Sequence, residues 1–199
     1  MSTVGVLALQ GDVREHLAAA TRVGATAIGV RRLGELESVD ALIIPGGEST
    51  TIDKLLRAFD LFAPLKERIH AGMPVMGSCA GMIMLATDLV GGIEGQQSLA
   101  AIPMTVRRNA FGRQVDSAET ELVWEPDGSA MHATFIRAPW VESCDPAVDF
   151  LATAAGPDGT RHPVAVRHGS AIATSFHPEI AAPGAVHDDR VHRLLLDLI

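Results

Sequence analysis

A cysteine with a glycine two residues away on either side stands where an apolar segment gives way to good helix formers. The stretch is Gly77-Ser78-Cys79-Ala80-Gly81, with Met73–Met76 before it and Met82–Ala86 after it. A strand that enters a helix through G-x-C-x-G is the cysteine form of the nucleophile elbow, a turn too tight for side chains at the glycine positions. The turn would place the Cys79 sulfur at a helix N-terminus, which favours the thiolate. A buried structural cysteine explains the pentapeptide equally well, so other segments must decide.

A candidate base and its orienting carboxylate lie near the C-terminus. Ser175-Phe176-His177-Pro178-Glu179 follows the strand-like run Ala171–Thr174. In extended chain, side chains two residues apart point to the same side, so His177 and Glu179 can lie together. A thiol nucleophile needs a base, and the base needs a group that fixes its tautomer. Alone, the segment is typical of an exposed polar turn; the elbow cysteine upstream favours the catalytic interpretation.

A glycine-rich loop is the third candidate. Pro45-Gly46-Gly47-Glu48-Ser49-Thr50-Thr51 follows the apolar run Asp40–Ile44. Two glycines after a parallel strand leave backbone N–H groups open to a ligand, and these could point at a developing oxyanion. A phosphate-binding loop is the competing interpretation, but the Gly-Lys-Ser/Thr ending is missing. For Gly46, a plain strand-to-helix turn also remains possible.

Strand and helix patterns alternate along the chain. The hydrophobic patterns predict strands at Val4–Leu9, Thr26–Val30, Ala41–Ile44, Val75–Gly77, Ile102–Val106, Ala133–Ile136, Val164–Val166 and Ala171–Thr174. They predict helices at Asp12–Val23, Ser49–Ala58, Phe62–Ala71, Ala80–Ala86 and His187–Leu198. The βαβαβ order of the first half implies an α/β fold, with a mostly parallel central sheet and helices on both faces.

The remaining segments complete this expectation. Residues 91–127 carry more glycine and charge, and we expect an antiparallel insertion or edge there. Asp158-Gly159 is a turn signal for a hairpin between Phe150–Thr153 and His162–Val166. We expect a single domain over residues 1–199, with Gly46-Gly47, Cys79 and His177 at the C-terminal ends of parallel strands, where ligands bind in such sheets.

Composition limits the function classes. A formal net charge of −8 argues against a nucleic-acid-binding protein. Two cysteines, Cys79 and Cys144, do not make a disulfide framework. The first apolar run is short and lacks a basic leader, and no run approaches the ~20 residues needed to cross a bilayer. We therefore expect a cytoplasmic enzyme, in a compartment that keeps a reactive thiol reduced.

The glycine loop, elbow cysteine and His-x-Glu in this order resemble the class I (triad) glutamine amidotransferases. More narrowly, the chain resembles the PdxT/SNO family, the glutaminase subunits of pyridoxal 5′-phosphate synthase. Besides the three motifs, the resemblance rests on Val4–Gly11, Glu15-His16, Arg108–Gln114, Phe135–Pro139 and Asp189–His192. Two departures are visible: Ser78 stands where the family more often has threonine, and Ala118 where it usually has phenylalanine.

The resemblance implies a flavodoxin-like amidotransferase fold and a function. The chain would hydrolyse L-glutamine to glutamate and ammonia through Cys79, His177 and Glu179. It would deliver the ammonia to a (β/α)₈-barrel synthase subunit that makes pyridoxal 5′-phosphate. Neither a cofactor nor a metal is implied.

The resemblance also assigns the substrate contacts. Gly47 and Ala80 N–H would form the oxyanion hole, and the glutamine contacts would be Gly47, Glu48, Ser49, Arg108, Ile136 and Arg137. Glu48 would face the ammonium and an arginine would clamp the carboxylate. Without the resemblance, Arg108 and Arg137 would be interpreted as solvated surface charges.

The other histidines show no metal-ligand spacing, and we expect no catalytic role for them. They are His16, His70, His132, His162, His168, His187 and His192. His187 and His192 are expected on an exposed polar helix, and Cys144 in a loop without a base nearby.

Three alternatives remain open from the sequence. The chain could serve another amidotransferase, such as the histidine-pathway glutaminase. It could be an elbow-cysteine hydrolase or protease, for which Arg108 and Arg137 would have no purpose. It could also be a binding module that has lost turnover, although the intact triad speaks against that.

Overall fold

The computed structural model describes residues 1–110, 118–157, 159–182 and 184–199. A seven-stranded sheet runs through this part of the chain in the order β10-β11-β12-β4-β3-β1-β2. Its strands are β1 (Thr3–Leu7), β2 (Thr26–Val30), β3 (Ala41–Ile44), β4 (Val75–Ser78), β10 (Asp149–Ala155), β11 (Arg161–His168) and β12 (Ala171–Thr174). The five strands from β12 to β2 are parallel, whereas β11 and β10 add an antiparallel edge. This confirms the predicted fold class.

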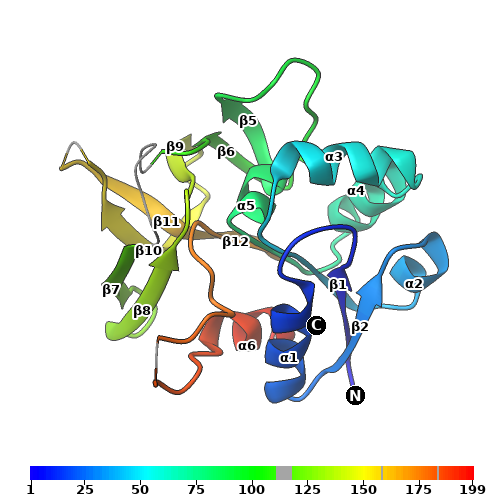
Figure 1. The fold of residues 1–199 in the computed structure, drawn as a ribbon, viewed down its shortest axis with the longest axis horizontal. Helices are drawn as coiled ribbons and strands as arrows, with labels where there is room; N and C mark the ends of the chain where they lie inside the picture. The colour runs from blue at the N-terminus through cyan, green and yellow to red at the C-terminus, as the bar shows by residue number, and fades with distance from the viewer. Residues whose placement is uncertain (111–117, 158, 183) are drawn as a thin grey trace.

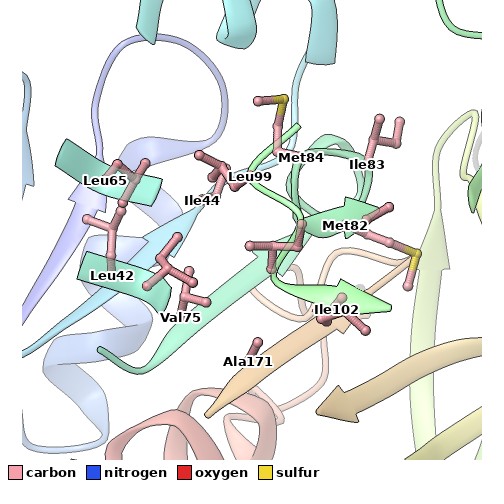
Figure 2. Packing of buried hydrophobic residues seen from close by; sticks show 14 of the residues in the cluster. Leu42, Ile44, Leu65, Val75, Met82, Ile83, Met84, Leu99, Ile102 and Ala171 are labelled. Atoms are coloured by element: carbon pink, nitrogen blue, oxygen red, sulfur yellow. The ribbon is translucent and has the colours of Figure 1, made fainter. Parts of the chain in front are cut away.

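The parallel strands are continuous apolar runs because both of their faces are buried. In β3, Leu42 and Ile44 pack into one hydrophobic cluster while Ala41 and Ile43 belong to the cluster on the opposite face. Figure 2 shows Leu42 and Ile44 together with Leu65 in the first of these clusters. Because successive side chains of a strand point to opposite faces of the sheet, this short segment contributes to the hydrophobic clusters on both faces.

Helices cover both faces of the sheet (Figure 1). One face carries α2 (Leu33–Glu37), α3 (Ser49–Ala58), α4 (Phe62–His70) and α5 (Ala80–Leu85), whose buried side chains join the first cluster. The other face carries α1 (Val13–Arg22) and α6 (Arg190–Leu196). The amphipathic patterns of α1 and α3 explain this placement, since each helix buries one stripe of residues.

Two small sheets lie beside the main sheet. β5 (Ala86–Val90), β6 (Ile102–Arg107) and β9 (Trp140–Cys144) form one, and β7 (Ala118–Trp124) with β8 (Ser129–Phe135) forms the other. Antiparallel pairing is present as β6–β9 and β7–β8, but β8 and β9 lie beyond residues 91–127, where the insertion was predicted, and β5 pairs with β6 in parallel. Strand β5 begins directly after α5, without a turn signal in the sequence.

Most predicted elements are present within a few residues of their predicted bounds, and some details differ. The last helix begins at Arg190 and not at His187. Cys144 is the final residue of β9 and not part of a loop, because residues 140–144 pair with β6. The predicted β10–β11 hairpin forms, although Asp158 of its turn lies outside the described residues, as do residues 111–114 of the family motif.

Across the described ranges, no helix is both long and apolar enough to cross a membrane.

Candidate active site

Three neighbouring strands bring the predicted chemical groups to one edge of the sheet. β3, β4 and β12 are adjacent and parallel, so their C-terminal ends lie side by side. Gly46 and Gly47 follow β3, Cys79 follows β4, and His177 follows β12. The structure thus confirms the prediction that these residues meet at the carboxyl ends of the strands.

The elbow around Cys79 is as tight as its glycines suggest. Cys79 has a φ of +50°, a conformation that non-glycine residues rarely adopt, and its N–H donates to the Thr174 carbonyl at 2.8 Å. A Cβ on Gly77 would lie 2.5 Å from the Gly81 backbone, and one on Gly81 would lie 2.2 Å from the Ile44 carbonyl oxygen. Gly77 is therefore required for β4 to pack against the start of α5, and Gly81 for α5 to pack against β3. Backbone strain of this kind is characteristic of functional sites.

His177 and Glu179 form the predicted pair. His177 Nδ1 lies 2.7 Å from Glu179 Oε1, and both side chains are almost completely buried. The backbone N–H of His177 donates to the Thr134 carbonyl at 3.1 Å, which ties this segment to β8. The pair therefore has the geometry that the His-x-Glu spacing predicts.

A second carboxylate lies close to the same imidazole. Asp12 Oδ2 is 3.4 Å from His177 Nδ1, and Asp12 N–H donates to the Gly46 carbonyl at 3.4 Å. The sequence patterns place Asp12 only at a helix start and do not identify it as a site residue. Its position soon after β1, at the same edge of the sheet, is the signal that could have identified it.

The surroundings of His177 favour its charged form. Burial lowers the pKa of His177, but hydrogen bonds to Asp12, Cys79 and Glu179 outweigh it and raise the pKa to about 12. The same contact with His177 lowers the pKa of Asp12. The site therefore holds an imidazolium between carboxylates and a sulfur atom at neutral pH.

A cavity of about 400 Å³ opens beside Cys79 and His177. Its lining includes Ala80 and all six predicted glutamine contacts, which are Gly47, Glu48, Ser49, Arg108, Ile136 and Arg137. Ile83 and Asn109 also line it and were not predicted. Glu179 lies behind His177, outside the lining.

Arg108 is held in the cavity wall by ion pairing. Its guanidinium donates to Glu48 Oε1 at 2.9 Å and to Gln96 Oε1 at 3.1 Å, and only 13% of its side chain is exposed. Glu48 also accepts from Thr51 N–H at the start of α3. The interpretation of Arg108 as a solvated surface charge is therefore wrong. Arg137, with a φ of +46°, is exposed at the cavity rim.

One group of potential metal ligands comes together in the described part of the chain. Asp12, His177 and Glu179 offer ligand atoms within 4.8 Å of one another. The hydrogen bonds from His177 Nδ1 account for this clustering.

Comparison with known proteins identifies the family of this chain. The sequence profile of the SNO glutamine amidotransferase family matches residues 6–197. The chain belongs to the SNO glutamine amidotransferase family. A pyridoxal 5′-phosphate synthase subunit PdxT from Mycobacteroides abscessus is 58% identical over 98% of this chain and 96% of the relative. One from Parafrankia sp. is 54% identical over 98% and 92%, respectively.

Solved structures share the fold. A crystal structure described as a glutamine amidotransferase has a TM-score of 0.86 at 45% identity and covers 98% of this chain and 97% of that one. A structure of PurLQS from Thermotoga maritima has a TM-score of 0.71 at 15% identity, covering 99% of this chain and 99% of that one, and shares the fold alone.

Two buried histidines lie behind the site, and the prediction of an exposed position for His192 is wrong. His16 of α1 and His192 of α6 are buried, and His16 Nδ1 lies 3.0 Å from His192 Nε2. The expectation of an exposed His192 fails because α6 turns Val191, His192 and Leu195 toward the core. His187 is exposed, but it precedes the helix.

Both buried rings are held neutral. Burial lowers the pKa of His192 to about 4; Asp189 raises this pKa by a smaller amount, and Arg22 lowers it further. Burial also lowers the pKa of His16 well below its usual range, and repulsion by His192 and His177 adds to the effect.

These shifts predict an acid-dependent loss of stability. Between about pH 6.5 and pH 4, His192 binds a proton in the unfolded chain but stays unprotonated in the folded chain. The free energy of unfolding therefore falls as pH falls. His192 alone accounts for a loss on the order of 3 kcal/mol, at about 1.4 kcal/mol per pKa unit. This loss is absent above about pH 7.

The raised pKa of His177 has the opposite effect, at higher pH. The stabilisation that the charged His177 contributes is lost as pH rises from about 6.5 to about 12.

Urea unfolding at a series of pH values measures this slope. His192→Leu should flatten it between pH 4 and pH 6.5 by about one proton. The matched control His187→Leu, at an exposed position, should leave the slope unchanged. An identical slope in His192→Leu and the unaltered chain would contradict the assignment.

Proposed function

We propose that the chain is a glutaminase that hydrolyses L-glutamine to glutamate and ammonia and supplies the ammonia for pyridoxal 5′-phosphate synthesis. The observation that carries the proposal is the convergence of the strained Cys79, the His177–Glu179 pair and the polar wall of Glu48 and Arg108 on one cavity. Family membership agrees with this activity.

The first half of the reaction forms a thioester. The thiol proton of Cys79 passes to His177, the sulfur attacks the side-chain amide carbon, and the carbonyl electron pair moves to oxygen. Gly47 and Ala80 N–H are the candidates for stabilising that oxyanion, since both residues line the cavity beside Cys79. The intermediate collapses as the C–N bond breaks, and the His177 imidazolium donates its proton to the departing nitrogen. Glu179 stabilises the imidazolium throughout.

Hydrolysis then restores the enzyme. His177 takes a proton from water as the hydroxide adds to the thioester carbon, and the C–S bond breaks to release glutamate. The proton retained on His177 returns the site to its resting charge.

Substrate recognition is assigned to the cavity wall. Arg108 is fixed by Glu48 and Gln96, so it is preorganised to bind the α-carboxylate of glutamine. Glu48 lies in position to face the α-ammonium, and Ser49, Ile136 and Arg137 complete the wall. Recognition of both the α-ammonium and the α-carboxylate would select free glutamine over a glutamine residue inside a peptide, which lacks these charges.

A second protein would use the ammonia. The relatives are named as subunits of pyridoxal 5′-phosphate synthase, which supports a synthase partner for this chain. The resemblance of the sequence to the PdxT/SNO family implies that this partner is a (β/α)₈ barrel. Ammonia released into water at neutral pH would become protonated and lose its nucleophilicity. Direct delivery within a hetero-oligomeric complex avoids this loss.

The alternatives have less support. A protease would not need the Arg108–Glu48 ion pair in its cavity wall. A histidine-pathway glutaminase would have the same triad, but the relatives reported above are named for a different pathway. A binding module without turnover would not need the strained Cys79 conformation.

Cys79→Ala should abolish glutamine hydrolysis and leave the fold intact, because it removes the nucleophile from a buried, well-packed turn. Cys144→Ala is the matched control, since Cys144 lies in β9 outside the cavity lining, and it should retain activity. A glutamine-derived diazo ketone should label Cys79 alone, as read by peptide mass spectrometry. Labelling of Cys144, or turnover by Cys79→Ala, would disprove the assignment.

The isolated chain should be a weak glutaminase whose activity rises when the synthase binds. The Gly46-Gly47 loop can rest in an unproductive conformation, and docking would select the productive one. Gln10 is the group positioned to hold the resting loop, because its Oε1 accepts from Glu48 N–H at 2.9 Å. Steady-state glutamate release with and without excess synthase, together with a binding measurement, tests this. Equal rates for the isolated chain and the mixture, or no complex in the presence of glutamine, would contradict it.

A further inference from the structure

A row of buried polar groups continues behind the proposed triad. Glu179 Oε1 faces His177, whereas Glu179 Oε2 points the other way and lies 3.3 Å from His16 Nε2. His16 Nε2 is also 2.9 Å from Ser78 Oγ, on the residue that precedes the nucleophile. His16 Nδ1 meets His192 Nε2 at 3.0 Å. All these side chains are nearly or fully buried, and they come from α1, α6, β4 and the segment after β12.

The carboxylate determines which nitrogen of His16 carries the proton. A nitrogen lone pair directed at a buried carboxylate oxygen would be repulsive, whereas an N–H there is attractive. Among the described residues, Glu179 Oε2 has no hydrogen bond of ordinary geometry, and His16 Nε2 lies 3.3 Å from it, within reach of a shared N–H. That proton serves Ser78 Oγ and the carboxylate together, and His16 Nδ1 is left as an acceptor.

His192 then has only one suitable tautomer. Because His16 Nδ1 accepts, His192 must donate from Nε2, and its own Nδ1 carries the lone pair. That Nδ1 is buried and, within the described ranges, has no hydrogen-bond partner. Both N–H bonds therefore point along the row toward Glu179.

We propose that His16 and His192 are positioning residues, two neutral imidazoles protonated on Nε2 that hold the far side of Glu179 so that its Oε1 faces His177. The proposal rests on the Cys79–His177–Glu179 assignment made above. Neutral donors suit this position, because a cation there would cancel the negative charge that stabilises the His177 imidazolium. The burial that keeps both rings uncharged supports the same arrangement.

Two variants of His16 separate positioning from packing. His16→Leu keeps the volume and removes the donor, whereas His16→Gln keeps an N–H near the position of Nε2. With the full chain and the synthase, His16→Leu should lower kcat about 10- to 100-fold, the factor associated with losing a hydrogen bond to a charged group. The KM for glutamine should stay within about twofold, because neither ring lines the cavity. His16→Gln should recover most of kcat.

Counting active sites removes the contribution of misfolded protein. Stoichiometric labelling with the diazo ketone gives kcat per reactive Cys79, which a merely structural defect would leave unchanged. If the unaltered chain is active and His16→Leu has the same kcat per labelled site, the positioning role is wrong while the triad stands. If the unaltered chain with synthase does not hydrolyse glutamine, the proposed function itself fails.

¹⁵N NMR of histidine-labelled chain tests the tautomers without relying on activity or on a variant that folds poorly. At neutral pH, the ring ¹⁵N signals of His16 and His192 should show both residues protonated on Nε2 and unprotonated on Nδ1. Correlations between each ring and neighbouring backbone amides would assign the signals to the two residues. Protonation of His16 on Nδ1, or a charged ring at either residue, would overturn the proposal.

Discussion

A buried carboxylate sets the conditions for the rest of the site. Glu179 is 2% exposed, and a charge removed from water is strongly destabilising unless it is paired. His177 pairs with one oxygen, and His16 lies against the other. The elements that carry these two rings cannot shift independently, because a shift of either one would leave an oxygen of the buried carboxylate without its partner.

The parallel sheet makes this arrangement possible. β3, β4 and β12 end at one edge, and the apolar sequence of each strand places it between two cores. Gly81 lets α5 start against the carbonyl of Ile44, which fixes Cys79 in its strained conformation. The same packing that stabilises the sheet therefore positions the nucleophile. The strain at Cys79 is offset by the burial of α5, whose six residues are all buried.

Local patterns were sufficient to predict the frame of the molecule. The apolar runs at β2, β3 and β12 and the helix α3 have the bounds that their periodicity predicts. The placement of Cys79 and the Gly46-Gly47 loop at one sheet edge follows from the βαβ order of the first half. His177 joins them because β12 pairs in parallel with β4. Short strands such as β5 and β9 escaped prediction because they are defined by their pairing partners and not by their own composition.

The polar groups behind the triad could not be predicted from local patterns. His16 and His192 lie 176 positions apart, and each is unremarkable in its own helix. Only the packing of α1 and α6 on the same face brings them together and excludes water from both. Asp12 was missed for a related reason, since its approach to His177 depends on how the loop after β1 meets the loop after β3. Long-range contacts of this kind are visible only in the folded chain.

The most direct test of this account is the kcat of Glu179→Gln, measured per diazo-ketone-labelled site beside His177→Asn. The account predicts a loss on the order of 10³-fold or more for His177→Asn, because members of a triad act as a unit. Glu179→Gln should show a smaller but clear loss with little change in KM, since Glu179 orients and stabilises the imidazolium without touching the substrate. An unchanged kcat in Glu179→Gln, or a variant as inactive as Cys79→Ala, would contradict the role given to the buried carboxylate.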